Sequence, residues 1–184
     1  MLDEASSDVL LAVTRGDAAF GVTYIGTQEA DIDFLPLIEE AFVVACPRSH
    51  PLAKCRTVKW KELEEHSYIA LAQGSGNRFL IDQALARSSS RPRWFYEVNH
   101  VPALVSLVMA GLGVGVVPRM ALPPDGHERL AAVPIIEPKV SRSLGLISRR
   151  GRKLPAAAQL LYDMIAAKRT ALGRKRSAPE RRKI

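Results

Sequence analysis

One short segment of the sequence has the residue types of a ligand-binding loop. Gln73-Gly74-Ser75-Gly76-Asn77 follows the apolar run 68–72 and precedes the amphipathic run 78–88. Two glycines let a backbone approach a ligand closely, and the free N–H groups at a helix start favour an anion. Ser75 and Asn77 would add side-chain hydrogen bonds. The alternative is an ordinary strand-to-helix turn in which Ser75 or Asn77 caps the helix.

A second segment of this kind is Asn99-His100, between the apolar run 93–98 and the run that begins at Val101. Asn99 would cap a helix or donate to a ligand, and His100 would do the same at the rim. A cap beside a solvated histidine is the alternative. In a parallel sheet both segments would lie at the carboxyl ends of strands, where ligands of α/β proteins bind. Together they predict a binding cleft.

Residues suited to catalysis or metal binding are few. The four histidines are scattered without metal-ligand spacing, and local sequence places none of them beside a serine or cysteine nucleophile. Glu39-Glu40 and Glu64-Glu65 are predicted to be solvated, since acidic residues are seldom buried unpaired. We therefore expect no catalytic residue, no metal, no cofactor and no enzymatic activity.

The elements that must position these segments alternate between strand and helix. Helices are predicted from Ser6 to Gly16 and at 58–66, 78–88 and 154–169. Strands are predicted at 18–24, 34–38, 41–46, 68–72, 93–98, 129–135 and 143–149. Short buried strands between helices are typical of an α/β architecture with mostly parallel sheets.

The uncharged stretch from Val101 to Pro118 has about the length of a membrane span. Three glycines in its second half would weaken such a helix, and its valines favour a strand. We expect a short buried helix that ends at Gly111, a tight turn, and a buried strand that ends at Pro118. No membrane association is expected.

The charge is concentrated at the end of the chain. Eight basic residues follow from Lys168 onward against Glu180 alone, which accounts for the whole net charge of +7 of these 184 residues. Such a tail is predicted to be disordered and solubilising, with nucleic-acid contact as the alternative. The first ten residues lack the features of a signal peptide, so Cys46 and Cys55 are expected to be reduced thiols in the cytoplasm, Cys46 in the core and Cys55 in a loop.

Five segments in series resemble the effector-binding domain of the LysR-type transcriptional regulators. The likeness covers about residues 2–168 and is carried by the following segments: SSDVLLAVTRGDAAFGVTY, PLIEEAFVVACPRSHPLA, LEEHSYIALAQGSGNRFLIDQAL, YEVNHVPALVSLVMAGLGVGVVPRMAL and SRSLGLISRRGRKLPAAAQLLYDMI.

The resemblance implies a two-lobed α/β fold of the periplasmic-binding-protein type 2, hinged by two crossover strands. Lobe I would hold residues 1–42 and 119–168, lobe II residues 43–118, and residues 169–184 would form the basic tail. It also implies a dimer or tetramer of the full-length protein, with the helix from Arg78 at the dimer contact.

The resemblance further implies a small organic effector, often a carboxylate, in the interlobe cleft. Its expected contacts come from both lobes: Ser75, Gly76, Asn77, Asn99, His100, Ser6, Ser7 and Thr23.

The sequence departs from the family at two places. The winged helix-turn-helix, the linker helix, and the first strand and helix of lobe I are not found, so we expect lobe I to be incomplete and DNA to be read only by a helix-turn-helix absent from these residues. Peroxide-sensing members carry a cysteine where this chain has Ser75, and redox sensing is therefore not expected. A stand-alone small-molecule-binding protein and an enzyme of the same fold are the alternative functions.

Overall fold

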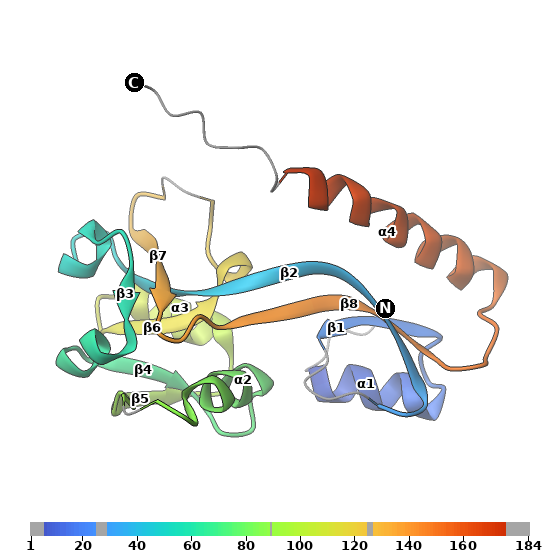
Figure 1. Ribbon diagram of the computed structural model, residues 1–184, viewed down its shortest axis with the longest axis horizontal. Coiled ribbons are helices and arrows are strands. Elements are labelled where there is room, and N and C mark those ends of the chain that lie inside the picture. Colours follow the sequence, from blue (N-terminus) through green and yellow to red (C-terminus); the bar gives the residue numbers. More distant parts are fainter. Residues whose placement is uncertain (1–5, 25–28, 89, 125–126, 176–184) are drawn as a thin grey trace. The chain divides into compact units, whose positions relative to one another are not determined.

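The computed structural model describes residues 6–24, 29–88, 90–124 and 127–175, with only the backbone for residues 6–7 and 169–175. They divide into two compact units, one made of residues 1–39 and 143–184 and the other of residues 40–142. The chain passes from one unit to the other within two strands, β2 (Ile32–Pro47) and β8 (Ser141–Arg149) (Figure 1).

The family resemblance implied that residues 40–42 and 119–142 belong to lobe I, whereas these residues fall in the second unit. The reason is strand pairing. The strand β7 (Leu130–Ile136) lies antiparallel to the second half of β2 and parallel to β3 (Val58–Lys59).

The first unit is a small sheet with a helix packed on it. Its elements are α1 (Ser6–Arg15), β1 (Phe20–Tyr24), the first half of β2, most of β8 and α4 (Ala156–Lys175). The strand β1 pairs antiparallel with β8, which lies next to β2. Val13 of α1 and Ile147 of β8 are fully buried. Gly21 allows this close approach, because a side chain there would lie 2.5 Å from Val9.

The second unit is a sheet with helices on both faces. Its further strands and helices are β4 (Tyr68–Leu71), α2 (Gly76–Leu85), β5 (Trp94–Val98), α3 (Val101–Met109) and β6 (Val114–Pro118), with the 3₁₀ helices η1 (Pro51–Lys54), η2 (Trp60–Glu65) and η3 (Arg119–Ala121). The strand β4 is parallel to β5 and β6, but β2 is antiparallel to β6 and β7. The sheet is therefore mixed, and the expectation of mostly parallel sheets was wrong.

Alternation along the strands builds two cores, one on each face of this sheet. In β2, Phe42, Val44 and Cys46 join the core under α2. Val43 and Ala45, on the opposite face, join the core under α3. Successive side chains of a strand point to opposite faces, so one apolar run serves both helices.

The uncharged stretch folds as the sequence predicted. It forms α3, a turn in which Gly111 has φ +80°, and the fully buried strand β6. Glycine adopts this left-handed conformation without the steric cost that a side chain would bring. No helix among the described residues is long and apolar enough to cross a membrane.

Three other elements differ from the prediction. The two segments expected around Glu39-Glu40 are one continuous strand, β2, because Glu40 is buried and paired. The helix expected at 58–66 is the short strand β3 followed by η2, because Val58 is fully buried and pairs with Ile135. The helix α4 continues to Lys175, into the segment expected as a disordered tail, since its alanines, lysines and arginines favour a helix. Residues 176–184 lie outside the described residues.

Gly113 gives a test of the packing between β6 and the segment before β4. A Cβ atom at Gly113 would collide with the backbone oxygen of Ser67, which accepts a hydrogen bond from the N–H of Val114 at 2.9 Å. We expect Gly113→Ala to lower the free energy of unfolding by about 2 kcal/mol or more. Urea unfolding followed by tryptophan fluorescence measures it, because both tryptophans lie in the second unit.

Gly74→Ala is the matched control, because a Cβ atom there would have no neighbour within 4 Å. It should change the free energy of unfolding by less than about 1 kcal/mol. Equal losses in the two variants would contradict the packing described for Gly113.

Candidate functional site

Three parallel strands of the second unit end at the same edge of the sheet. These are β5, β4 and β6; β4 leads directly into α2, and β5 leads directly into α3. The N–H of Ala72, just after β4, donates to the carbonyl oxygen of Val98 at the end of β5 at 2.9 Å. The two segments that the sequence singled out, 73–77 and 99–100, are therefore brought to one edge.

Both helices begin at this edge without a side-chain cap. Ser75 is the N-cap residue of α2 and His100 that of α3, and neither side chain accepts a capping hydrogen bond. The alternative that Ser75 or Asn77 serves as a side-chain cap is not supported, because the Asn77 side chain is bonded elsewhere. The first-turn N–H groups of the two helices are left without the side-chain partners that caps supply.

Arg142, at the start of β8, holds the side chain of Asn77. Its Nη1 donates to Oδ1 of Asn77 at 2.7 Å. This bond fixes the orientation of the amide, so the Nδ2 of Asn77 is directed away from the guanidinium. Nδ2 makes no hydrogen bond among the described residues and remains a donor for a ligand.

Glu40 holds Arg142 in turn. The Oε2 of Glu40 lies 2.8 Å from both Nε and Nη2 of Arg142, and its Oε1 accepts from the N–H of Met120 at 2.6 Å. The residue is 1% exposed. The prediction that Glu40 is solvated was wrong, because a buried carboxylate is tolerated when a cation and an N–H compensate it. Glu39, Glu64 and Glu65 are exposed, as predicted.

Asn77 and Arg142 line a pocket of about 530 Å³ at this edge. Its remaining walls are mostly apolar and come from α3, the end of β6 and η3: Val101, Pro102, Val105, Ser106, Pro118, Met120 and Ala121. Apolar walls with a few polar groups are typical of small-molecule sites, and this volume lies in their usual range of about 300–1,000 Å³. The arrangement can hold a small molecule whose acceptor atoms meet Asn77 and the edge of the Arg142 guanidinium.

Of the predicted ligand residues that the structure describes, only Asn77 lines this pocket; the others lie at or just before the start of α2 or α3 or belong to the first unit. Ser75 and Gly76 immediately precede Asn77, and Asn99 and His100 are exposed just before α3. Thr23 is buried in β1 of the first unit, where its hydroxyl donates to the carbonyl oxygen of Tyr24 at 3.4 Å. Ser6 and Ser7 begin α1, and their side chains lie outside the described residues. Contacts of these residues with a ligand stay predictions.

The groups that do other chemistry are not gathered at this site. Cys46 is fully buried, and burial together with Cys55 raises the pKa of its thiol to about 11. A thiol with such a pKa is a poor nucleophile at neutral pH. Among the described residues no group of three or more His, Cys, Asp and Glu side chains could hold a metal ion.

Of the residues that line this pocket, the sequence singled out Asn77 alone as a ligand contact and did not point to Arg142. The sequence holds one hint of the Arg142 pairing: Glu40 directly precedes the apolar run 41–46. A carboxylate that is buried beside such a run needs a cationic partner. The sequence does not say which of its many arginines supplies that partner.

Substitution of Glu40 tests how the site is held. Glu40→Gln removes the carboxylate that compensates Arg142, so we expect the free energy of unfolding to fall by about 2–4 kcal/mol. In the double variant with Arg142→Gln, the loss should be smaller than the sum of the two single losses by about 1 kcal/mol or more. Urea unfolding of the four proteins measures this coupling. Glu64→Gln, at an exposed position, is the control, and strictly additive losses would contradict the pairing.

Comparison with solved structures identifies the fold. The effector binding domain of QuiR, in complex with shikimate, superposes with a TM-score of 0.79 and 26% sequence identity, over 91% of this chain and 79% of that one. The regulatory domain of CcmR from Synechocystis PCC6803, in complex with 2-PG, gives 0.77 at 19% identity, over 89% and 79%. The α/β fold with a periplasmic-binding-protein-like architecture is thereby confirmed.

Sequence comparison identifies the family. YbhD of Escherichia coli (strain K12), an uncharacterized HTH-type transcriptional regulator, is 36% identical over 165 residues, 90% of this chain and 52% of that protein. YfeR of Shigella flexneri, named in the same way, is 32% identical over 171 residues, 92% and 55%. The chain spans about half the length of these curated relatives. The four proteins are named as transcriptional regulators, a regulatory domain or an effector binding domain and none as an enzyme, in agreement with the prediction. The family model of the LysR substrate binding domain matches residues 2–169, and the chain belongs to this family.

Proposed function

We propose that this chain senses a small organic carboxylate for a LysR-type transcriptional regulator, and that the carboxylate binds at the pocket of Asn77 and Arg142. The observation that carries the proposal is the orientation of Asn77: its Oδ1 is occupied by Arg142, and its amide donors are left at the pocket. A carboxylate accepts hydrogen bonds from such donors and is favoured by the N-termini of α2 and α3.

The nature of the walls limits the ligand. Valine, proline and methionine side chains make up most of the pocket, so the body of the molecule should be compact and partly apolar. Shikimate, the ligand in the QuiR structure, is a ring carboxylate of this size class, and QuiR shares 26% identity with this chain. Both points support the class of ligand, a small ring or chain with one carboxylate.

In this proposal the chain is the ligand-sensing part of a longer regulator. The relatives are named as HTH-type regulators, and this chain spans 52% and 55% of their length. We propose that the longer regulator reads DNA through such a helix-turn-helix. We further propose that the regulator is a cytoplasmic homo-oligomer. Ser75, Gly76, Asn99, His100, Ser6, Ser7 and Thr23 are retained as candidate ligand contacts.

Calorimetric titration tests the proposal, with shikimate and a panel of other small carboxylates as probes. We expect saturable binding of at least one of them, with no turnover. Asn77→Ala combined with Ser75→Ala should weaken that binding about tenfold or more, because donors to the carboxylate are lost. Arg142→Lys, which keeps the charge that compensates Glu40, should also weaken it.

The matched control is Ser88→Ala, which lies beyond the end of α2 and outside the pocket. If the variant with Asn77→Ala and Ser75→Ala binds the carboxylate as tightly as the unchanged chain, the ligand binds at another site. Conversion of the probe to a product would favour the enzyme alternative. Failure of every carboxylate would exclude the proposed ligand class.

A further inference from the structure

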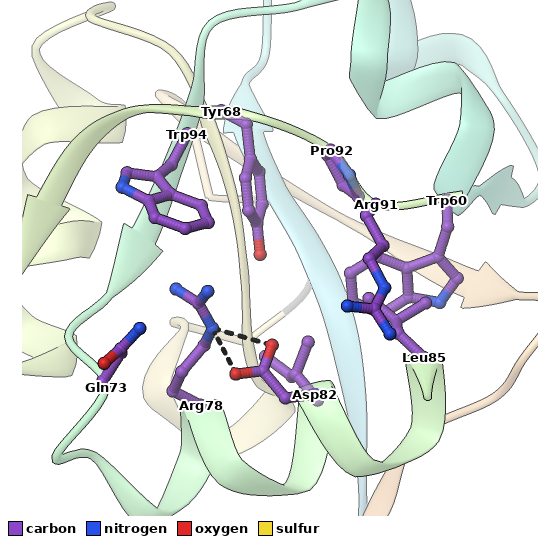
Figure 2. A pocket seen from close by; sticks show the side chains of 10 residues that line it. Trp60, Tyr68, Gln73, Arg78, Asp82, Leu85, Arg91, Pro92 and Trp94 are labelled. Atoms are coloured by element: carbon purple, nitrogen blue, oxygen red, sulfur yellow. Dashed lines mark hydrogen bonds and ion pairs between the residues drawn. The ribbon is translucent and has the colours of Figure 1, made fainter. Parts of the chain in front are cut away.

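A second pocket, of about 430 Å³, lies in the same unit on the other face of the sheet (Figure 2). Its buried wall residues Trp60, Tyr68, Ile81 and Leu85 belong to the core under α2, whereas the first pocket lies against α3. The two pockets share no lining residue. The full lining is Trp60, Tyr68, Gln73, Arg78, Ile81, Asp82, Leu85, Arg91, Pro92 and Trp94.

A buried guanidinium is the main polar group of this second pocket. Arg78 is 8% exposed, and its Nε lies 2.8 Å from both carboxylate oxygens of Asp82. Its Nη1 donates to the carbonyl oxygen of Leu71 at 3.0 Å. Its Nη2 makes no hydrogen bond among the described residues. A buried cation with an unused donor is ready to bind an acceptor that enters the pocket.

Two aromatic side chains, Trp94 and Tyr68, lie beside this guanidinium. It stacks over the ring of Trp94, 4.5 Å from the ring centroid. Figure 2 shows the Trp94 ring, the Tyr68 hydroxyl and the Arg78 guanidinium turned toward the same space. Burial raises the pKa of Tyr68, so its hydroxyl stays protonated at neutral pH and can donate a hydrogen bond.

The charges of the lining leave one positive charge uncompensated. Asp82 balances Arg78, and Arg91 makes no ion pair among the described residues. Arg91 is exposed at the pocket, next to Pro92. One net positive charge beside aromatic walls matches a ligand with one negative charge and a flat ring.

We propose that this pocket is a second ligand site, which takes a small aromatic carboxylate. The ring packs between Trp94 and the apolar wall of Trp60 and Leu85. The carboxylate accepts hydrogen bonds from Nη2 of Arg78 and from Tyr68, and it pairs with Arg91. The site is independent of the proposed pocket at Asn77, since it stands on other residues of the opposite face.

Intrinsic tryptophan fluorescence can detect binding at the second pocket. Trp60 and Trp94 are the chain's two tryptophans, and both line the second pocket. Titration of the full chain with benzoate, followed by intrinsic tryptophan fluorescence, should give a saturable change. Benzamide, a neutral molecule of the same shape, should bind about tenfold more weakly because it cannot pair with Arg91.

Substitutions separate this site from the first pocket. Arg91→Gln should weaken benzoate binding about tenfold, whereas Arg93→Gln, an exposed arginine outside the second pocket, should leave it nearly unchanged. Asn77→Ala, in the other pocket, should also leave the fluorescence titration unchanged.

Several results would overturn the proposal. They are the absence of a saturable change with benzoate, equal effects of Arg91→Gln and Arg93→Gln, and loss of the signal in Asn77→Ala with retention in Arg91→Gln. If the tryptophan fluorescence changes with the concentration of the protein but not with the concentration of benzoate, a second copy of the chain fills the pocket. That outcome also contradicts the proposal. None of these results tests the first pocket, for which calorimetric titration of the Asn77 variant is the measurement.

Discussion

A buried carboxylate and its cation organise the edge of the sheet where the candidate site lies. Glu40 is enclosed at the point where β2 enters the second unit, and it contacts both Arg142 and the backbone of η3. Through Arg142 the same interaction reaches Asn77 at the start of α2. The cost of leaving either charge unpaired in the interior fixes all three elements together. The donors of the pocket are thus held in place before a ligand arrives, which reduces the ordering that binding must impose.

The doubly covered sheet explains how one unit can hold two different pockets. Alternating side chains of β2, β4 and β6 supply a core to each face, and each core supports one helix. The pocket beside α3 has Arg142 already paired with Glu40, so it relies on hydrogen-bond donors and helix ends. The pocket beside α2 has aromatic walls and an arginine at its mouth. In the two proposals both pockets take an anion, and their different walls favour different acids.

The helices, turns and strands that depend on neighbouring residues could be predicted from the sequence. Gly111 and the valines before Pro118 mark a helix, a turn and a strand, and the structure has all three. The loop at Ser75 and Asn77 marks a helix start at a strand end. Long-range pairing was not predictable in the same way. Arg142 and Glu40 are distant in sequence, and nothing local says that this arginine reaches that carboxylate. The antiparallel entry of β2, which makes the sheet mixed, is a property of the whole topology.

The position of a carboxylate at Asn77 and Arg142 can be seen in a crystal of the chain soaked with shikimate. We expect density for the ligand in the pocket between α3 and the start of α2, with its carboxylate within hydrogen-bond distance of Asn77 Nδ2 and the Arg142 guanidinium. The bonds from Glu40 to Arg142 and to Met120 should persist in the complex. Density for shikimate at another place, with this pocket left to solvent, would contradict binding at Asn77 and Arg142.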